Sequence, residues 1–302
     1  MNYCVMNALY WSRNGQSKDD YFKNAVVSLC SIQGDSVDKI LVTNDVNIPD
    51  EYATILDNHG VKVMECSFDT YVFPKGTPWE YGFYKICALE HVTEYCTYDK
   101  ILLLDADTLC IRPLDEAFWK DMDTVMLYRL PASIEQSDRR TFLDECHCFF
   151  SNQNVLEYYG GEFVGGPRES LIQYFDICKK VYQSMKDNGY VSVRGDEFIW
   201  SYAASSLPKV KTGNPYILRV EITQRYYATE TRYVYPDVKI LHALCEKQTG
   251  LIYIYNYLRK KGHIPPLKTV RRVFGLPKAK RRLTDMTMLH VKSYIKKIMK
   301  KG

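Results

Sequence analysis

The sequence predicts an α/β protein built on a mostly parallel, doubly wound sheet with helices on both faces. Apolar runs of strand length alternate with segments of helical periodicity through the N-terminal half, as in chains of βαβ units. Residues 101–104 form one such run without polar alternation, which is typical of a strand buried on both faces. The 302 residues suffice for one large domain, and 46% hydrophobic with 25% charged residues is a globular composition.

Local patterns place the N-terminal elements. A strand is expected at residues 3–9, followed by a helix that Asp19 or Asp20 can cap. Pro49 and Gly60 mark the two ends of a second helix, because proline suits the first turn and glycine the position after the last one. The other elements expected in this half are strands at 39–43, 61–66 and 101–104 and a helix at 81–93.

The second half alternates less regularly. In the strand expected at 158–167, two glycine pairs flank a mainly apolar triplet, residues 162–164. A long helix at 169–188 carries one apolar stripe and ends before Gly189. The other elements expected here are a strand at 124–127, a mixed region at 139–153, an apolar helix that begins at Asp196 and a strand at 239–242.

Two carboxylates, Asp105 and Asp107, follow the buried strand at 101–104 directly. A carboxylate pair in that position is costly unless a cation or hydrogen bonds compensate it. The edge beyond the carboxyl ends of the strands is also where open α/β sheets bind ligands. A divalent metal, Mn²⁺ or Mg²⁺, satisfies both observations. The alternative is an ordinary turn in which these side chains serve the turn and hold no metal.

The segment Leu-Leu-Asp-Ala-Asp-Thr-Leu at 103–109, with Arg-Pro-Leu-Asp-Glu-Ala-Phe at 112–118, resembles the metal-binding segment of the GT-A glycosyltransferases. Within them it is most similar to the retaining, glycogenin-like family, which uses nucleotide sugars. The resemblance implies a Rossmann-like GT-A fold and a nucleotide-sugar donor, expected to be a UDP-sugar. It also implies that Asp105 and Asp107 bind the metal, and that Asp105 and Ala106 lie against the donor.

His242, Lys247 and Lys85 extend this resemblance. The glycogenin-like family has a His that completes the metal site, followed by Gly and by a Lys-Pro-Trp whose lysine meets the diphosphate. His242 and Lys247 match that His and Lys, although Lys247 stands nearer to the His than in the family, and Gly and Pro-Trp are missing. Lys85 resembles a lysine beside the donor in the family's Thr-Lys-Leu segment. The alternatives are a satisfied core histidine and a solvated surface lysine.

The end of the first strand and the turn after it contain Asn7, Tyr10 and Trp11. This turn is a candidate site for the uracil base, which could stack on Tyr10 or Trp11 and bond to backbone amides. The alternative is that both rings fill the core.

The glycine-rich strand resembles a Tyr-Tyr, Phe-x-Gly-Gly run in a second retaining GT-A family, the blood-group-type galactosyltransferases. Because glycine permits close backbone approach, the stretch from Gly160 to Gly166 is a candidate floor under the donor sugar, with Gly165 and Gly166 as the expected donor-binding pair. Downstream, that family has His-Asp-Glu-Ser-His-Leu-Asn and the glycogenin-like family has Asp-Gln. Asp196 matches both patterns and Glu197 the first only, which implies that one of them orients the sugar or lies beneath its anomeric carbon. The alternative is a pair of helix N-terminal acids.

The formal net charge of +4 conceals an acidic body and a basic tail. Residues 259–302 hold 15 Lys and Arg and one acid, a net +14, which leaves −10 for residues 1–258. From Thr287 onward, apolar residues and lysines fall on opposite helical faces, and no apolar run is long enough to span a membrane. We therefore expect a GT-A domain at 1–258 and a basic amphipathic tail at 259–302 that binds an anionic membrane surface. Nucleic acid is the alternative partner of such a tail and is not expected.

The ten cysteines lack the spacing of a disulfide framework, and residues 1–9 are not expected to form a signal peptide. We expect reduced thiols in a cytoplasmic protein, with the tail on the cytoplasmic face of a membrane.

Together these features predict a metal-dependent hexosyltransferase that moves a hexose from a nucleotide diphosphate sugar to a glycan or glycolipid acceptor. Retention of configuration follows from the resemblance alone. A nucleotidyltransferase also binds metal through aspartates on an α/β sheet, but it would be expected to carry a Gly-rich basic loop that residues 7–18 lack. A non-catalytic carbohydrate-binding protein on the same fold is the other alternative.

Overall fold

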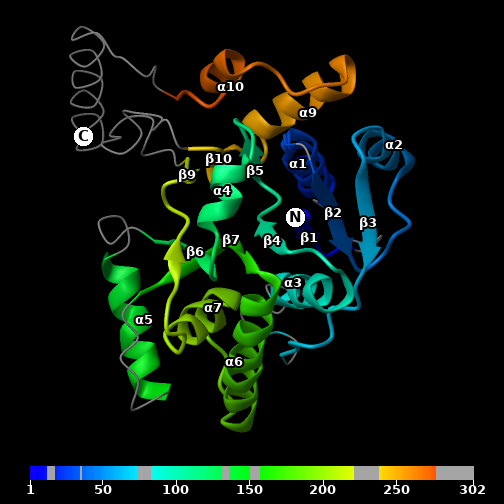
Figure 1. Ribbon diagram of the computed structural model, residues 1–302. Helices are drawn as coiled ribbons and strands as arrows, with labels where there is room; N and C mark the ends of the chain where they lie inside the picture. The colour runs from blue at the N-terminus through cyan, green and yellow to red at the C-terminus, as the bar shows by residue number, and fades with distance from the viewer. Residues whose placement is uncertain are drawn as a thin grey trace, which may run out of the picture.

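The structure, a computed structural model, describes residues 1–11, 18–34, 36–73, 76, 83–130, 136–149, 157–220 and 238–276. Its centre is a seven-stranded sheet in the order β3-β2-β1-β4-β7-β6-β8 (Figure 1). All strands run parallel except β7, which is antiparallel to both of its neighbours. This confirms the predicted mostly parallel sheet. The strands are β1 (Tyr3–Leu9), β2 (Val37–Thr43), β3 (Val61–Glu65), β4 (Lys100–Leu104), β6 (Met126–Arg129), β7 (Tyr159–Pro167) and β8 (Lys211–Thr212).

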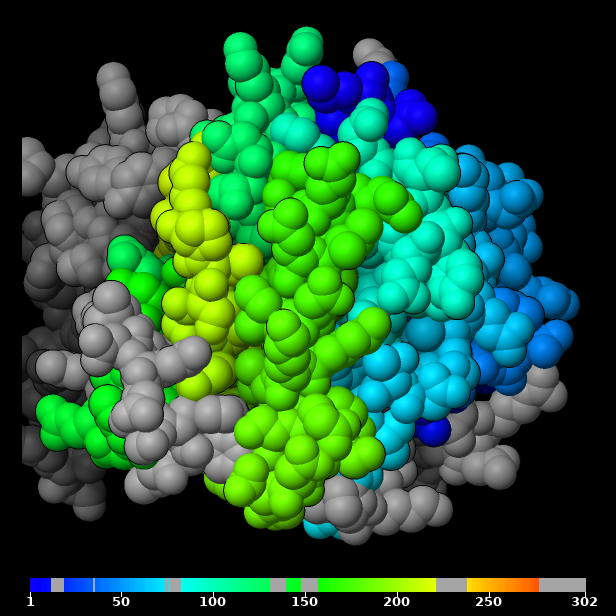
Figure 2. Space-filling view, turned by 60° about the horizontal axis from the view of Figure 1, so that its bottom comes forward, coloured from blue at the N-terminus to red at the C-terminus, as the bar shows by residue number. Residues whose placement is uncertain are grey.

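Helices flank the sheet in two groups, above and below it in Figure 1. The first group comprises α1 (Lys18–Ser31), α2 (Asp50–Asn58) and α9 (Gly250–Lys261), which pack around α1. The second comprises α3 (Tyr84–Tyr95), α6 (Arg168–Asp187) and α7 (Asp196–Ala204), which pack around α6. Figure 2 shows α6 beside α3 on the face of the molecule that the second group covers. The apolar stripe predicted for α6 is buried throughout, so this part of the pattern is confirmed.

A second, three-stranded sheet has the order β5-β10-β9. Strand β10 (Ile240–His242) pairs antiparallel with β5 (Thr108–Cys110) and parallel with β9 (Ile217–Arg219). Strands β5 and β9 were not predicted, because three residues carry too little periodicity to be recognised. This small sheet joins the segment after β4 to the C-terminal part of the chain, and it thereby sets the geometry of the site described below.

Two regions differ from the sequence-based expectations. The region expected to be mixed at 139–153 contains a regular helix, α5 (Gln136–Phe149). Helix α9 runs on past residue 258 to Lys261, and Val270 and Phe274 are buried in and after α10 (Leu267–Val273). The described structure therefore continues to Leu276, while the basic amphipathic helix expected from Thr287 lies outside the described residues. A short helix, α4 (Glu116–Asp121), follows β5. None of the described helices combines the length and the apolar character needed to cross a membrane.

Candidate active site

The turn after β4 holds the two predicted metal ligands. The carbonyl oxygen of Asp105 accepts hydrogen bonds from the backbone N and the Oγ1 of Thr108, at 3.1 and 2.8 Å. Ser28 of α1 contacts the same Thr108 hydroxyl at 2.8 Å. The turn is thus held by backbone and hydroxyl groups, and the hydrogen bonds that form it do not use the carboxylates of Asp105 and Asp107. This favours a functional role for the two carboxylates over the turn-forming alternative.

Strand pairing brings His242 to this turn. The antiparallel register of β5 and β10 places His242 opposite Thr108, the residue after Asp107. The Nε2 atom of His242 lies 3.2 Å from Oδ2 of Asp107 and 3.9 Å from Oδ2 of Asp105. One ligand atom from each of the three residues lies within 4.8 Å of the other two.

The three residues fit a divalent metal. His242 and Asp107 are 2% and 3% exposed, and both ring nitrogens and Asp107 Oδ2 lie 3.1–3.3 Å from charged side chains. Buried charges in proteins are normally paired or coordinate a metal, and a buried cluster of this kind is suited to both. Two carboxylates and an imidazole are donors that Mn²⁺ accepts. Asp105, Asp107 and His242 could therefore hold the metal that the sequence predicts.

Glu162 is a site residue that the sequence analysis missed. Its Oε1 atom lies 3.3 Å from Nδ1 of His242 and 3.6 Å from Nε of Arg219 on β9. Metal-binding histidines usually present their second ring nitrogen to a carboxylate, which fixes the ring orientation. An acid inside an otherwise apolar strand was the available indication, because a buried carboxylate needs a partner. A side chain on Gly160 would place its Cβ 1.9 Å from the Glu162 carboxylate, so this glycine makes room for it.

Both predicted lysines reach the carboxylates. Lys247 Nζ lies 3.1 Å from Asp107 Oδ2 and also sits over the ring of Tyr21, 5.7 Å from its centroid. Lys85 Nζ lies 3.0 Å from Asp105 Oδ1 and 3.2 Å from Asp196 Oδ2. Its side chain is only 14% exposed, which excludes the solvated surface lysine. Lys85 therefore links the carboxylate turn to the start of α7.

Gly161 allows this link to form. A Cβ at Gly161 would lie 2.6 Å from Asp196 Oδ2 and 2.7 Å from Lys85 Nζ, and its carbonyl oxygen is 3.4 Å from the same Nζ. Successive residues of a strand face opposite sides of the sheet. Gly161 accordingly faces Asp196 and Lys85, whereas Glu162 faces His242.

The other glycine pair lies elsewhere, which corrects the expectation for Gly165 and Gly166. They pair with Leu102 and Ile101 inside the sheet. Side chains there would meet the backbone of β4 and of residues 124–125. Gly165 and Gly166 therefore serve close packing of the strands. The glycine pair that the structure brings to the charged site is Gly160 and Gly161.

Asp196 and Glu197 have different surroundings. Asp196, 6% exposed, accepts a hydrogen bond from Trp200 Nε1 at 3.1 Å on the same oxygen that faces Lys85. Glu197 accepts a hydrogen bond from the Tyr158 hydroxyl, and Arg194 lies over the Tyr158 ring, 5.1 Å from its centroid. Asp196 thus belongs to the Lys85 cluster, while Glu197 belongs to a neighbouring one.

The residues predicted to hold the base surround the end of β1. Asn7 donates from Nδ2 to the carbonyl oxygen of Leu104 at 2.8 Å, directly before Asp105. Its Oδ1 is buried and lacks a hydrogen bond within the described part of the chain. Tyr10 and Trp11 are partly exposed, and Trp11 exchanges two backbone hydrogen bonds with the Asn44 side chain. Trp11 also packs edge-on against Phe22 at 5.7 Å, so both expected roles, base platform and core filler, are compatible with this turn.

The charges in the site are interdependent. Burial alone would lower the pKa of His242, but the carboxylates of Asp107 and Glu162 raise it to about 10. Burial alone would raise the pKa of Asp107, but His242 and Lys247 hold it below its usual value. Burial and the nearby Asp107 raise the pKa of Asp105, although Lys85 opposes this. Without a bound cation, the basic side chains thus balance the carboxylates of the turn.

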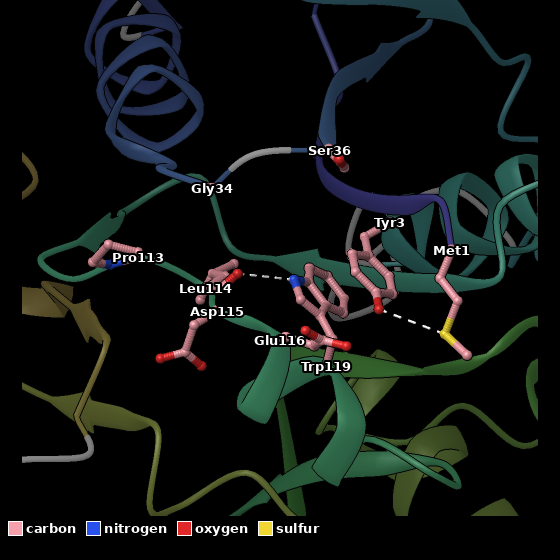
Figure 3. Close-up of a pocket in the computed structure, with 9 residues that line it drawn as sticks. All are labelled: Met1, Tyr3, Gly34, Ser36, Pro113, Leu114, Asp115, Glu116 and Trp119. Carbon is pink, nitrogen blue, oxygen red and sulfur yellow. Dashed lines mark hydrogen bonds between the residues drawn. The ribbon is translucent and has the colours of Figure 1, made fainter.

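A cleft of about 600 Å³ lies at the opposite end of β1 from the candidate site (Figure 3). Tyr3 and Trp119 stack in it at 4.6 Å, and the Trp119 indole donates to the carbonyl oxygen of Leu114. Asp115, one of two acids in the lining, caps α4 and pairs with Lys239 at 2.7 Å. The cleft contains none of the predicted site residues and lies away from the carboxyl ends of the strands, where ligands of such sheets bind.

Comparison with solved structures identifies the fold. The chain is similar to mouse xyloside xylosyltransferase 1, with a TM-score of 0.52 and 13% identity over 82% of this chain and 99% of that one. It is also similar to the bifunctional glycosyltransferase WbbM, with a TM-score of 0.54 and 12% identity over 80% of this chain and 46% of that one. An active-site mutant of LgtC gives a TM-score of 0.56 and 13% identity over 80% of this chain and 87% of that one. No family model and no curated protein matches the chain. The chain therefore has a GT-A glycosyltransferase fold, as the sequence resemblance implied, while the glycogenin-like family remains an expectation.

Proposed function

We propose that the protein is a metal-dependent glycosyltransferase that moves a hexose from a UDP-sugar to a glycan or glycolipid acceptor. The observation that carries this proposal is the cluster of Asp105, Asp107 and His242 at the carboxyl end of the central strand of a GT-A fold. The fold alone hosts more than one function, so the proposal rests on the chemistry of the site.

The residues divide into three groups of roles. Asp105, Asp107 and His242 would hold Mn²⁺ or Mg²⁺, which supplies Lewis-acid stabilisation of the leaving diphosphate. Lys247 adds a positive charge beside Asp107, where negative charge develops on the leaving group. Asn7, Tyr10 and Trp11 would bind the base, and Ala106 would lie against the donor.

The donor sugar would lie against β7 on the side of the sheet that Gly161 shares with Lys85 and Asp196. Lys85 holds the Asp196 carboxylate in place, and the absence of a side chain at Gly161 leaves room for this pair beside the ring. A retaining reaction would then place Asp196 or Glu197 beneath the anomeric carbon, and we favour Asp196 because it belongs to the cluster that contains the metal ligands.

Hydrolysis of nucleotide sugars tests the reaction class. UDP-glucose, UDP-galactose, UDP-N-acetylglucosamine and UDP-N-acetylgalactosamine would each be incubated with the protein, with Mn²⁺ or with a chelator. We expect slow release of UDP from at least one donor with Mn²⁺ only, because transfer to water needs no acceptor. No release from any of the four would count against a glycosyltransferase, and release of pyrophosphate from a sugar phosphate and UTP would indicate a nucleotidyltransferase instead.

We also propose that residues 277–302, with nine Lys and Arg and one acid, bind an anionic membrane surface on the cytoplasmic side. Removing this segment spares Val270 and Phe274, which are buried, so the truncated protein should keep its donor turnover. Each basic residue near such a surface contributes about 1 kcal/mol. Flotation with phosphatidylserine vesicles should therefore be lost on truncation and weakened by salt. Flotation that neither change affects would contradict this assignment.

A further inference from the structure

A cleft of about 380 Å³ lies between α1 and the segment that follows β10. It adjoins the proposed metal site through Lys247, whose ammonium group is 3.1 Å from Asp107. Its lining residues come from only these two segments, and most of them are polar: Asp20, Tyr21, Asn24, Lys247, Gln248 and Thr249.

Asn24 is the unusual member of this lining. Its side chain is 1% exposed, and within the described structure neither its amide nitrogen nor its amide oxygen has a hydrogen bond. A buried amide that offers two donor hydrogens and an acceptor is normally satisfied, and each exception calls for an explanation. A ligand in the cleft that both donates and accepts hydrogen bonds would satisfy both ends of the Asn24 amide.

The surrounding groups indicate the chemical class of that ligand. Tyr21 is 45% exposed, and one face of its ring lies under the ammonium group of Lys247. Gln248 and Thr249 are exposed and provide a further amide and a hydroxyl. Asp20 and Lys247 carry opposite charges, so the lining does not select for an anion or a cation. Neutral amides, hydroxyls and an exposed aromatic ring instead suit a neutral molecule with many hydroxyl groups.

We propose that this cleft is a subsite that binds the hydroxyl groups of a sugar ring, with Asn24 as its central hydrogen-bonding residue. The inference rests on the proposed glycosyltransferase function for the source of the ring. Two sources share this chemistry: the ribose of the nucleotide donor and a ring of the acceptor glycan.

The test compares Asn24→Leu, which keeps the size of the side chain and removes its amide, with Asn58→Leu, which makes the same change at an exposed position in α2. Rates of UDP release from a donor that the protein hydrolyses with Mn²⁺ give the KM for that donor. Saturation-transfer NMR with methyl glycosides of glucose, galactose, mannose and xylose gives binding of acceptor-type rings. Asn24→Leu should weaken either the apparent affinity for the donor or the binding of methyl glycosides by about tenfold. This is the loss expected for a single good hydrogen bond. A raised donor KM identifies the ribose, and weaker glycoside binding identifies the acceptor.

Two further measurements keep the proposal falsifiable. Because the Asn24 amide has no hydrogen-bond partner among the described residues, Asn24→Leu should melt no lower than the unchanged protein. A marked drop would show that the amide serves the fold and would overturn the subsite. Gln248→Ala, a change at an exposed position, should weaken the binding of the same ligand that Asn24→Leu affects. If neither variant changes donor KM or glycoside binding, the subsite is also overturned. A protein without any donor turnover overturns the proposed function instead, and the NMR binding then decides the cleft by itself.

Discussion

Asp107→Asn is expected to lower donor turnover by about a hundredfold or more, because electrostatic stabilisation of a developing charge is usually a large part of catalysis. Asp107 Oδ2 is the oxygen that faces both His242 Nε2 at 3.2 Å and Lys247 Nζ at 3.1 Å. The variant keeps the shape of the side chain but removes the charge that a divalent cation needs. Steady-state UDP release with saturating Mn²⁺ measures the effect.

The variant should also be somewhat less stable. Asp107 is 3% exposed, and losing one partner of a buried ion pair leaves the other charge uncompensated. Asp38→Asn is the matched control, since it removes a carboxylate that pairs with Lys62 at the other end of the parallel strands. The control should keep full turnover. Turnover in Asp107→Asn equal to that of the control would rule out the role assigned to Asp107.

Asp196→Asn should lower kcat by about a hundredfold with little change in donor KM, because the proposed role is realised only as the sugar reacts. Asparagine can still accept the hydrogen bond from Trp200, but it no longer carries the charge that faces Lys85 at 3.2 Å. If Asp196 were only an acid favoured by the N-terminus of α7, the variant would lose about 0.5–1 kcal/mol of stability and keep its kcat. Melting temperature and kcat, measured on the same preparation, separate these results.

Glu197→Gln tests the neighbouring carboxyl through its pH dependence. Burial, with the added effect of Glu162, raises the pKa of Glu197 to about 8, from an ordinary value of 4.5. The folded protein therefore holds this proton between about pH 4.5 and 8 when the unfolded chain does not, so the contribution of Glu197 to stability falls as the pH rises through that window. Glutamine does not titrate.

The melting temperature of Glu197→Gln, relative to the unchanged protein, should therefore be higher at pH 9 than at pH 5.5. The measurement is made without metal or donor. An equal difference at the two pH values would show that Glu197 titrates normally in the fold.

The sequence predicted the long elements because their apolar patterns are strong. Strand β1 was placed at its observed bounds, and the stripe on α6 faces the core as expected. The carboxylate turn was also recognisable, since Asp105 and Asp107 directly follow a strand that is buried on both faces. What the sequence could not supply was pairing between distant short strands. The contact between His242 and Asp107 depends on the three-residue pairing of β5 and β10, and the resemblance to a known family pointed to it before any local pattern did.

The glycine-rich strand shows the opposite outcome. Composition suggested close backbone approach at both glycine pairs, but it could not tell which pair lies near the charged site. The register of β7 against β4 decides this, because Phe163 pairs with Leu104 and so sets Glu162 beside Asp105. The apolar side chains of Phe163 and Val164 dominate the pattern of residues 162–164, so the pattern did not indicate that the carboxylate of Glu162 faces His242.

Calorimetric titration of Mn²⁺ in the presence of UDP tests the central claim most directly, since it measures metal binding without any assumption about donor sugar or acceptor. The unchanged protein should bind Mn²⁺ at a single saturable site per chain. Asp107→Asn should lose this binding, and Asp38→Asn should retain it. Equal Mn²⁺ affinity in Asp107→Asn and the unchanged protein would contradict the assignment of Asp105, Asp107 and His242 as the metal site.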